Sequence, residues 1–226
     1  MGLYKDINDY ALRIKSAAKW NGSNEAVTHV YKNHKDFNVE SNYVYEFYVL
    51  VRILESLTSS YKLEYIPDKR NKHQFPKAAG NKENYPFFVA YNLKDAKTII
   101  FQICAGTKII NKYENDIYPD ISFQNANADM CLTERDIMFI IDAKHKKRKR
   151  DRVTTDDVKV FVNDVASLNI DISLIIVQFD APLNEIDKCA IITNGQKHLD
   201  NDKMLADYKC MVMYDFYPGE AIKILE

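Results

Sequence analysis

Asp142 and Lys144 have the spacing in this chain that best suits chemistry. They stand two positions apart in the triplet Asp142-Ala143-Lys144, directly after the apolar run 137–141. In an extended strand, side chains two positions apart point to the same face, so the carboxylate and the ammonium group should face one way. The triplet therefore predicts a charged pair presented at the end of a buried strand.

A second carboxylate comes from Asp120, which follows Pro119 and precedes Asp142 by 22 residues. Two carboxylates brought to one edge of a sheet can hold a hard divalent cation, because such ions prefer oxygen ligands. Lys144 could then steady or deprotonate an attacking water, or offset charge that builds up on a phosphate. This combination favours metal-dependent hydrolysis of a phosphodiester bond.

The acid-x-lysine pattern is common, so the residues around each copy decide which one could form a site. Only the copy at Asp142 ends an extended apolar strand; Asp157 and Lys159 fall on a helix, where residues two apart do not face each other, and Asp95 and Asp207 fall in turns. Asp68, after a proline, and Asp95 could form a rival pair. However, neither a basic run nor a capped helix follows Lys97, whereas both follow Lys144.

Three helices are expected before residue 60. Apolar residues recur at helical spacing over 3–18, 26–34 and 43–57, and the third stripe is apolar enough to require packing on a sheet. Glu46 lies on the shoulder of that stripe, one turn before Leu50, and Glu55 is the alternative acid on the same helix. We expect residues 1–42 to form a helical N-terminal extension and 43–226 to form the core.

The rest of the chain predicts a sheet with one further helix. Thr154 has the form of a helix cap before a stripe that runs from Val158 to Leu168. With the expected strand at 172–179, this helix would form a right-handed crossover after the strand of Asp142. The fold class is thus α/β, a mixed central sheet flanked by helices. Strands are expected at 61–66, 86–91, 98–103, 118–123, 136–144, 172–179, 189–193 and 210–216, with an exposed loop at 67–86.

Charge is concentrated in the basic run, residues 144–152, which has seven Lys or Arg and one acid. The other residues include 24 basic and 31 acidic side chains, a net charge of −7. Such a run could meet about half a dozen phosphates and make binding salt-dependent, although a solvated or localisation-type cluster is the alternative. The cationic residues proposed to contact nucleic acid are Lys146, Lys147, Arg148, Lys149, Arg150 and Arg152, together with Lys69, Arg70 and Lys72 in the loop 67–86.

Composition excludes several classes of protein. The chain is 46% hydrophobic, which indicates a folded globule, and it has no apolar run of 18 residues and no apolar core of a signal peptide near Met1. A cytoplasmic protein without membrane association is expected. The four cysteines form no C-x-x-C pair, so neither a disulfide framework nor a zinc finger is indicated. Phosphate-binding Gly-rich loops, H-E-x-x-H and G-x-S-x-G are absent from the sequence.

The arrangement resembles the PD-(D/E)xK nuclease superfamily, which has the restriction-endonuclease-like fold. The resemblance rests on Pro119-Asp120 and Asp142-Ala143-Lys144, with Glu46 on an upstream helix, and it covers residues 43–179. It implies that Asp120, Asp142 and the carbonyl of Ala143 bind Mg²⁺, for which Mn²⁺ would substitute. It further implies that Lys144 positions the water and that Glu46 binds a second ion or a metal-bound water.

One feature of an exonuclease-like branch of that superfamily is absent. The helix after Lys144 reads Val158-Lys159-Val160-Phe161-Val162-Asn163-Asp164 and lacks a Gln-x-x-x-Tyr motif. Restriction-type, defence-type or transposition-type endonucleases are therefore better neighbours, and an Mg²⁺-dependent endonuclease acting on DNA is the leading interpretation. A role in restriction or antiphage defence, with a homodimer or a partner ATPase or regulatory subunit, is compatible with it. The alternatives are an RNA-cleaving nuclease and a non-catalytic nucleic-acid-binding or assembly module.

Other polar residues near the motif have simpler interpretations. His145 could contact phosphate, but alternation along a strand should point it away from Lys144. Asp129 and Glu134 lie between the two acidic motifs and are expected in a solvated hairpin.

Overall fold

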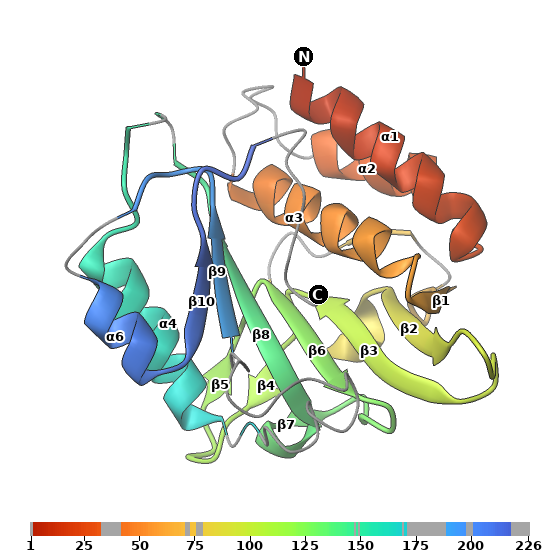
Figure 1. Ribbon diagram of the computed structural model, residues 1–226. Helices are drawn as coiled ribbons and strands as arrows, with labels where there is room; N and C mark the ends of the chain where they lie inside the picture. Colours follow the sequence, from red (N-terminus) through yellow and green to blue (C-terminus); the bar gives the residue numbers. More distant parts are fainter. Residues whose placement is uncertain are drawn as a thin grey trace.

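The structure is a computed structural model that describes residues 2–32, 42–70, 73–75, 79–146, 148, 150–168, 170, 189–197 and 201–217. It contains a seven-stranded mixed sheet with helices packed around it (Figure 1). The helices are α1 (Gly2–Ala17), α2 (Ser23–Lys32), α3 (Asn42–Leu57), α4 (Thr155–Ser167) and α6 (Asp202–Asp207). No helix among the described residues is long and apolar enough to span a membrane.

The large sheet has the strand order β1-β2-β3-β6-β8-β9-β10. Strands β1 to β8 in that order pair antiparallel, whereas β8, β9 and β10 run parallel. The pairing changes from antiparallel to parallel at β8. Parallel neighbours need a long connection, and the chain between β8 and β9 includes helix α4. The strands are β1 (Tyr61–Ile66), β2 (Phe87–Asn92), β3 (Ile99–Ala105), β6 (Ile121–Asn125), β8 (Ile137–Lys144), β9 (Cys189–Thr193) and β10 (Cys210–Met213).

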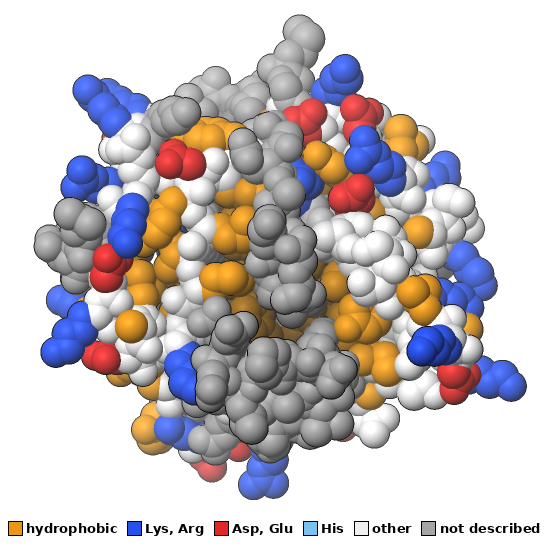
Figure 2. Space-filling model, in the orientation of Figure 1, with side chains coloured by type: hydrophobic (Ala, Val, Ile, Leu, Met, Phe, Trp, Pro, Cys, Tyr) orange, Lys and Arg blue, Asp and Glu red, His pale blue; other side chains and the backbone are white. Residues whose placement is uncertain are grey.

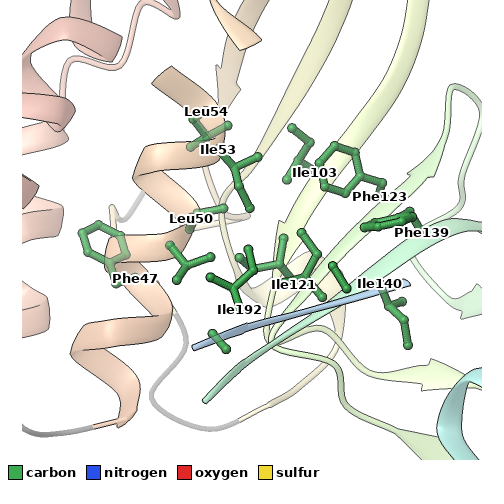
Figure 3. Close-up of a cluster of buried hydrophobic side chains, with 14 of the residues drawn as sticks. Phe47, Leu50, Ile53, Leu54, Ile103, Ile121, Phe123, Phe139, Ile140 and Ile192 are labelled. Carbon is green, nitrogen blue, oxygen red and sulfur yellow. The ribbon is translucent and has the colours of Figure 1, made fainter. Parts of the chain in front are cut away.

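The core lies between α3 and the middle of this sheet. Eleven of the 16 residues of α3 are buried, as expected for a helix that is apolar over most of its surface. Figure 3 shows Leu50 and Ile53 of α3 facing the sheet. The sheet contributes Ile103, Ile121 and Phe123, which are all at most 1% exposed. This contact fixes α3 over the central strands and so determines where its polar residues lie.

Helices α1 and α2 extend the same layer beside α3, and α4 and α6 lie together near β9 and β10 (Figure 1). Leu3 and Ile7 of α1 belong to the same buried cluster as α3 and the sheet, so the N-terminal helices share the main core. The expectation of a mixed sheet flanked by helices is confirmed at this level of detail.

A small second sheet was not predicted from the sequence. It contains β5 (Asp116–Ile117), β4 (Ile109–Ile110) and β7 (Leu132–Thr133) in that order. The chain between β4 and β5 reaches the end of α4, where Lys112 donates hydrogen bonds to the carbonyls of Ser167 and Ala166. Strands of two residues are too short to show a period in the sequence, which explains why they were missed.

One expected strand starts later than predicted, and the parallel neighbour of β8 is not the expected one. The strand expected at 118–123 begins at Ile121, so Asp120 lies directly before β6 and not within it. The parallel neighbour of β8 is β9, whereas we expected the segment 172–179, which lies outside the described residues. Helix α6 was also not expected, because its six residues are too few to show a helical period.

The prediction of an exposed loop over 67–86 is wrong in part. Phe75 is 2% exposed and Lys82 is 1% exposed. The Nζ atom of Lys82 donates to Gln102 Oε1 at 2.7 Å and to the carbonyls of Ala128 and Asp129. A lysine is buried only when its donors find partners, and Lys82 is therefore a structural residue and no candidate for nucleic-acid contact.

Trp20 is expected to be a main contributor to stability, because it is fully buried and its ring centroid lies 5.3 Å from that of Phe88 and 5.7 Å from that of Tyr65. Trp20→Ala should lower the free energy of unfolding by about 3–5 kcal/mol in a urea titration. Leu12→Ala, at an α1 position that is 44% exposed, should change it by less than about 0.5 kcal/mol. Similar losses in the two variants would contradict the assigned core.

Candidate active site at one edge of the sheet

The candidate acids lie at one edge of the large sheet, which we call the site edge. The strand register places the start of β6 beside the ends of β3 and β8, with Ile121 opposite both Ala105 and Ile141. The ends of β1 and β9 and the start of β2 lie at the same edge. Asp120 before β6 and Asp142 near the end of β8 are therefore neighbours, although 22 residues separate them in the sequence.

Asp120 is held by a backbone group of β8 and by one of the residue that follows β3. Its Oδ2 accepts a hydrogen bond of 2.7 Å from the backbone N–H of Ala143, and its carbonyl accepts one of 2.8 Å from Gly106. Gly106 has φ 56°, a conformation that other residues adopt with strain. The backbone at Gly106 and Ala143 thus orients the Asp120 carboxylate toward β8.

Asp142 and Lys144 form an ion pair at the end of β8. Lys144 Nζ lies 3.0 Å from Asp142 Oδ2, and the Asp142 side chain is only 10% exposed. Lys144 is thus the cationic neighbour of a carboxylate that is largely shielded from solvent. The backbone here is fixed by Thr193, whose Oγ1 donates to the Lys144 carbonyl at 2.6 Å.

Glu46 enters the site from α3. Burial and the nearby charge of Asp142 raise its pKa to about 7, and Lys144 opposes the shift. Glu55, the alternative acid on α3, is instead paired with Arg13, with 3.3 Å between Arg13 Nη1 and Glu55 Oε1. The structure therefore places Glu46 beside Asp142 and Lys144, and its packed helix explains how a residue so distant in sequence reaches them.

The charges of the site influence one another. Burial and the carboxylates of Asp142 and Glu46 raise the pKa of Asp120 well above its usual value, although the Ala143 N–H opposes the shift. Burial alone would lower the pKa of Lys144, but Asp142 more than offsets this effect and the pKa is raised. Three carboxyl groups share one partly buried cation, so the site has an excess of potential negative charge.

Asp164 of α4 is a further acid near this group that the sequence analysis did not select. It is half-buried, and burial followed by the charge of Asp142 raises its pKa. Its position next to Val165, at the margin of the apolar face of α4, was a usable signal. A search for polar residues along that margin would have found it.

The carboxylate oxygens of these residues are the kind of ligand that divalent cations such as Mg²⁺ prefer. In the described part of the chain, no three His, Cys, Asp or Glu side chains are close enough to hold a metal ion as they are placed. The carboxylates are nevertheless close enough to influence one another, since Asp142 and Glu46 raise the pKa of Asp120 and Asp142 raises that of Glu46. Asp120, Asp142 and Glu46 therefore offer the oxygen ligands that a hard cation prefers, although their side chains would have to move closer together to share one ion.

The basic run continues from Lys144 along the site edge. Lys146 Nζ pairs with Asp157 Oδ2 at 2.8 Å, so its charge is engaged within the protein. Arg148, Arg150 and Arg152 are exposed, whereas Lys147 and Lys149 lie outside the described residues. Lysine and arginine side chains project at the upper left of Figure 2, where the segment between β8 and α4 turns in Figure 1.

The second cationic segment follows the end of β1. Lys69 and Arg70 are exposed, three and four residues after Ile66, and Lys69 Nζ pairs with Glu83 Oε1 at 2.9 Å. Lys72 lies outside the described residues. The segment therefore lies near the site edge, on the opposite side of the acids from the basic run.

The rival pair is not assembled. Asp68 follows the end of β1 and Asp95 follows the end of β2, and antiparallel pairing puts these two ends at opposite edges of the sheet. Asp95 is exposed in a turn, where it accepts hydrogen bonds from Lys97 N and Thr98 Oγ1. The triplet at Asp95 is thus a turn motif and serves as a natural control for Asp142.

The remaining polar candidates have other surroundings. His145 directly follows β8, and its ring lies 5.6 Å from the ring of Tyr45 on α3. Glu134 lies before the first residue of β8, at the other end of the strand from Asp142. Asp129 is exposed, and its carbonyl accepts from Lys82.

Comparisons with known proteins identify no relative: no protein-family model, no curated protein and no solved structure matches this chain.

A pH dependence of stability follows from Glu46. Because its pKa is about 7 in the folded state against 4.5 as its ordinary value, folding favours the protonated form. This contribution to stability is complete below the lower value and is lost as the pH rises through the higher one. In EDTA, melting temperatures should therefore fall between about pH 5 and pH 8, and fall less in Glu46→Gln. Glu55→Gln should keep the wild-type dependence; an equal effect of both variants would exclude the assigned origin.

Proposed function

We propose that this protein is a divalent-metal-dependent endonuclease that hydrolyses phosphodiester bonds in DNA. The observation that carries the proposal is the convergence of three carboxyl groups and a lysine from separate elements. Glu46 comes from α3, Asp120 precedes β6, and Asp142 and Lys144 end β8. The comparisons identify no relative, so the argument rests on this geometry and on the resemblance of the motif to PD-(D/E)xK nucleases.

Each residue has a role that its surroundings support. Asp120 and Asp142 would hold Mg²⁺ or Mn²⁺ with the Ala143 carbonyl, and Glu46 would bind a second ion or an ordered water. A bound ion would polarise the scissile phosphate and lower the pKa of the attacking water. Lys144 is cationic beside Asp142, and this charge suits it to orient the water and to offset charge developing on the phosphate.

Two cationic segments support a polymeric substrate. The basic run follows β8 and the segment with Lys69 and Arg70 follows β1, at the two sides of the acids. From β1 to β9 there are five strand spacings of about 4.8 Å, or about 24 Å. That length corresponds to about seven base-pair steps of duplex, so both segments could contact one nucleic-acid backbone. A small phosphodiester would not need them.

The choice of DNA and a role in restriction or antiphage defence come from the resemblance. Phosphodiester chemistry does not itself select the sugar, so an RNA-cleaving enzyme with the same site is the alternative.

Asp142→Ala and Lys144→Ala should each lower the rate of cleavage by at least about 100-fold, because each removes a charge next to the reacting phosphate. Cleavage should be measured on supercoiled plasmid, linear DNA and single-stranded RNA with Mg²⁺, Mn²⁺ or EDTA. The matched controls are Asp95→Ala and Lys97→Ala, which change the same residue types in the exposed turn and should cut at the wild-type rate. Cleavage that survives Asp142→Ala would exclude the proposed site.

The substrate arms of this experiment separate the alternatives. Metal-dependent cutting of RNA alone would assign the RNA-cleaving function. Salt-sensitive binding without turnover in any arm would indicate a non-catalytic binding module.

Metal binding can be measured without turnover. Mg²⁺ should raise the melting temperature of the wild type, since a ligand that binds only the folded state stabilises it by mass action. Asp142→Asn keeps the shape of the side chain but removes a charged ligand, so its melting temperature should not respond to Mg²⁺. Asp95→Asn should respond as the wild type does, and a retained response in Asp142→Asn would place the ion elsewhere.

A further inference from the structure

The end of β9 and the turn after it, residues 193–197, hold the first part of the basic run. Thr193 Oγ1 donates to the carbonyl of Lys144 at 2.6 Å. The amide of Asn194 then binds both backbone groups of Lys146, since its Oδ1 accepts from Lys146 N at 2.6 Å and its Nδ2 donates to Lys146 O at 3.0 Å. Asn194 is 8% exposed and Thr193 is fully buried, so these contacts are shielded from water.

The same turn holds the far end of the run. Gln196 N donates to Asp151 O at 2.9 Å, and Gln196 also forms a β-bridge with Arg152. Gly195 fits tightly between the two ends: a Cβ atom there would lie 2.7 Å from Asp151 O and 2.8 Å from Lys146 Cγ. Close approach of the two segments therefore requires glycine at this position.

Between these anchors, two hydrogen bonds join Arg148 and Asp151. Asp151 N donates to Arg148 O at 2.9 Å, and Arg148 N donates to Asp151 Oδ2 at 3.2 Å. The side chains of Arg148 and Arg150 are exposed, whereas that of Lys146 pairs with Asp157. A solvated charge cluster would need neither the buried amide of Asn194 nor the glycine at 195.

We propose that Asn194 is a positioning residue that holds Arg148 and Arg150 in place beside Lys144, so that a nucleic-acid backbone bound by the arginines passes the acids of the site edge. The inference rests on the proposed function and adds to it the device that aligns the substrate. The same turn contacts Lys144 through Thr193 and Lys146 through Asn194, so the lysine of the site and the arginines are positioned by one element.

The test is the salt dependence of DNA binding, measured on the full chain in EDTA with a fluorescent duplex. Each phosphate contact contributes about 0.9 to the slope of log affinity against log salt concentration. The double variant Arg148→Ala/Arg150→Ala should therefore reduce the slope by about 2. Asn194→Asp replaces the Nδ2 donor by an oxygen facing the Lys146 carbonyl, and it should reduce the slope by a similar amount although it alters no arginine.

Combining the variants separates positioning from a general structural effect. If Asn194 acts through the arginines, Asn194→Asp added to the double variant should cause no further loss of slope. Asn92→Asp, at the exposed end of β2, controls for the added negative charge and should bind as the wild type does. Asn194→Ala removes both amide contacts without adding charge and gives the same test if Asn194→Asp does not fold. The rate at saturating DNA with Mg²⁺ should fall in the Asn194 variants.

The inference would be overturned by an unchanged slope in both Asn194 variants. It would also be overturned if the loss of slope in Asn194→Asp added in full to the loss in the double variant. In either case, DNA binding and cleavage by the wild type would still support the proposed function. A wild-type protein that neither binds nor cuts nucleic acid would overturn both.

Discussion

The packing of α3 against the central strands is the interaction on which the rest of the structure depends. Helix α3 buries most of its surface, and its apolar residues form one buried cluster with Ile103, Ile121 and Phe123 of the sheet, which excludes water from the middle of the molecule. Apolar burial of this kind is the dominant favourable term in folding. Because the helix is fixed by these contacts along its length, its first turns reach the site edge and carry Glu46 there.

The buried acids of the candidate site oppose folding, and the packing of the core compensates for this effect. Glu46 and Asp120 both have raised pKa values because burial and the Asp142 charge disfavour their ionised forms. Only Lys144 lies close enough to Asp142 to form an ion pair with it among the described residues. Such a group of acids is unfavourable for stability alone, and the cation of the proposed function would offset the repulsion between the acids. This imbalance is what distinguishes the site edge from an ordinary charged surface.

The surroundings of the site are held mainly by hydrogen bonds between a side chain and a backbone group. Gly106 and Ala143 orient Asp120, and the turn after β9 holds Lys144 and the basic run. Lys82 has a similar supporting role further from the site. Its buried ammonium group forms hydrogen bonds that link the sheet to the carbonyls of residues 128 and 129. Rigid support of this kind limits the movement of the site residues, as the proposed catalysis would require.

Much of this arrangement was predictable from local patterns. The sequence by itself determined the strand that carries Asp142 and Lys144, the helix after the basic run and the apolar helix that carries Glu46, because the 2-residue and 3.6-residue periods of apolar side chains are local properties. Only the tertiary structure decided that Glu46 and not Glu55 joins the acids, that Asp164 lies near them, that Lys82 is buried and that Asn194 holds the basic run. Those outcomes depend on strand order, register and helix position, which arise from the packing of segments distant in the chain and leave no period in the sequence.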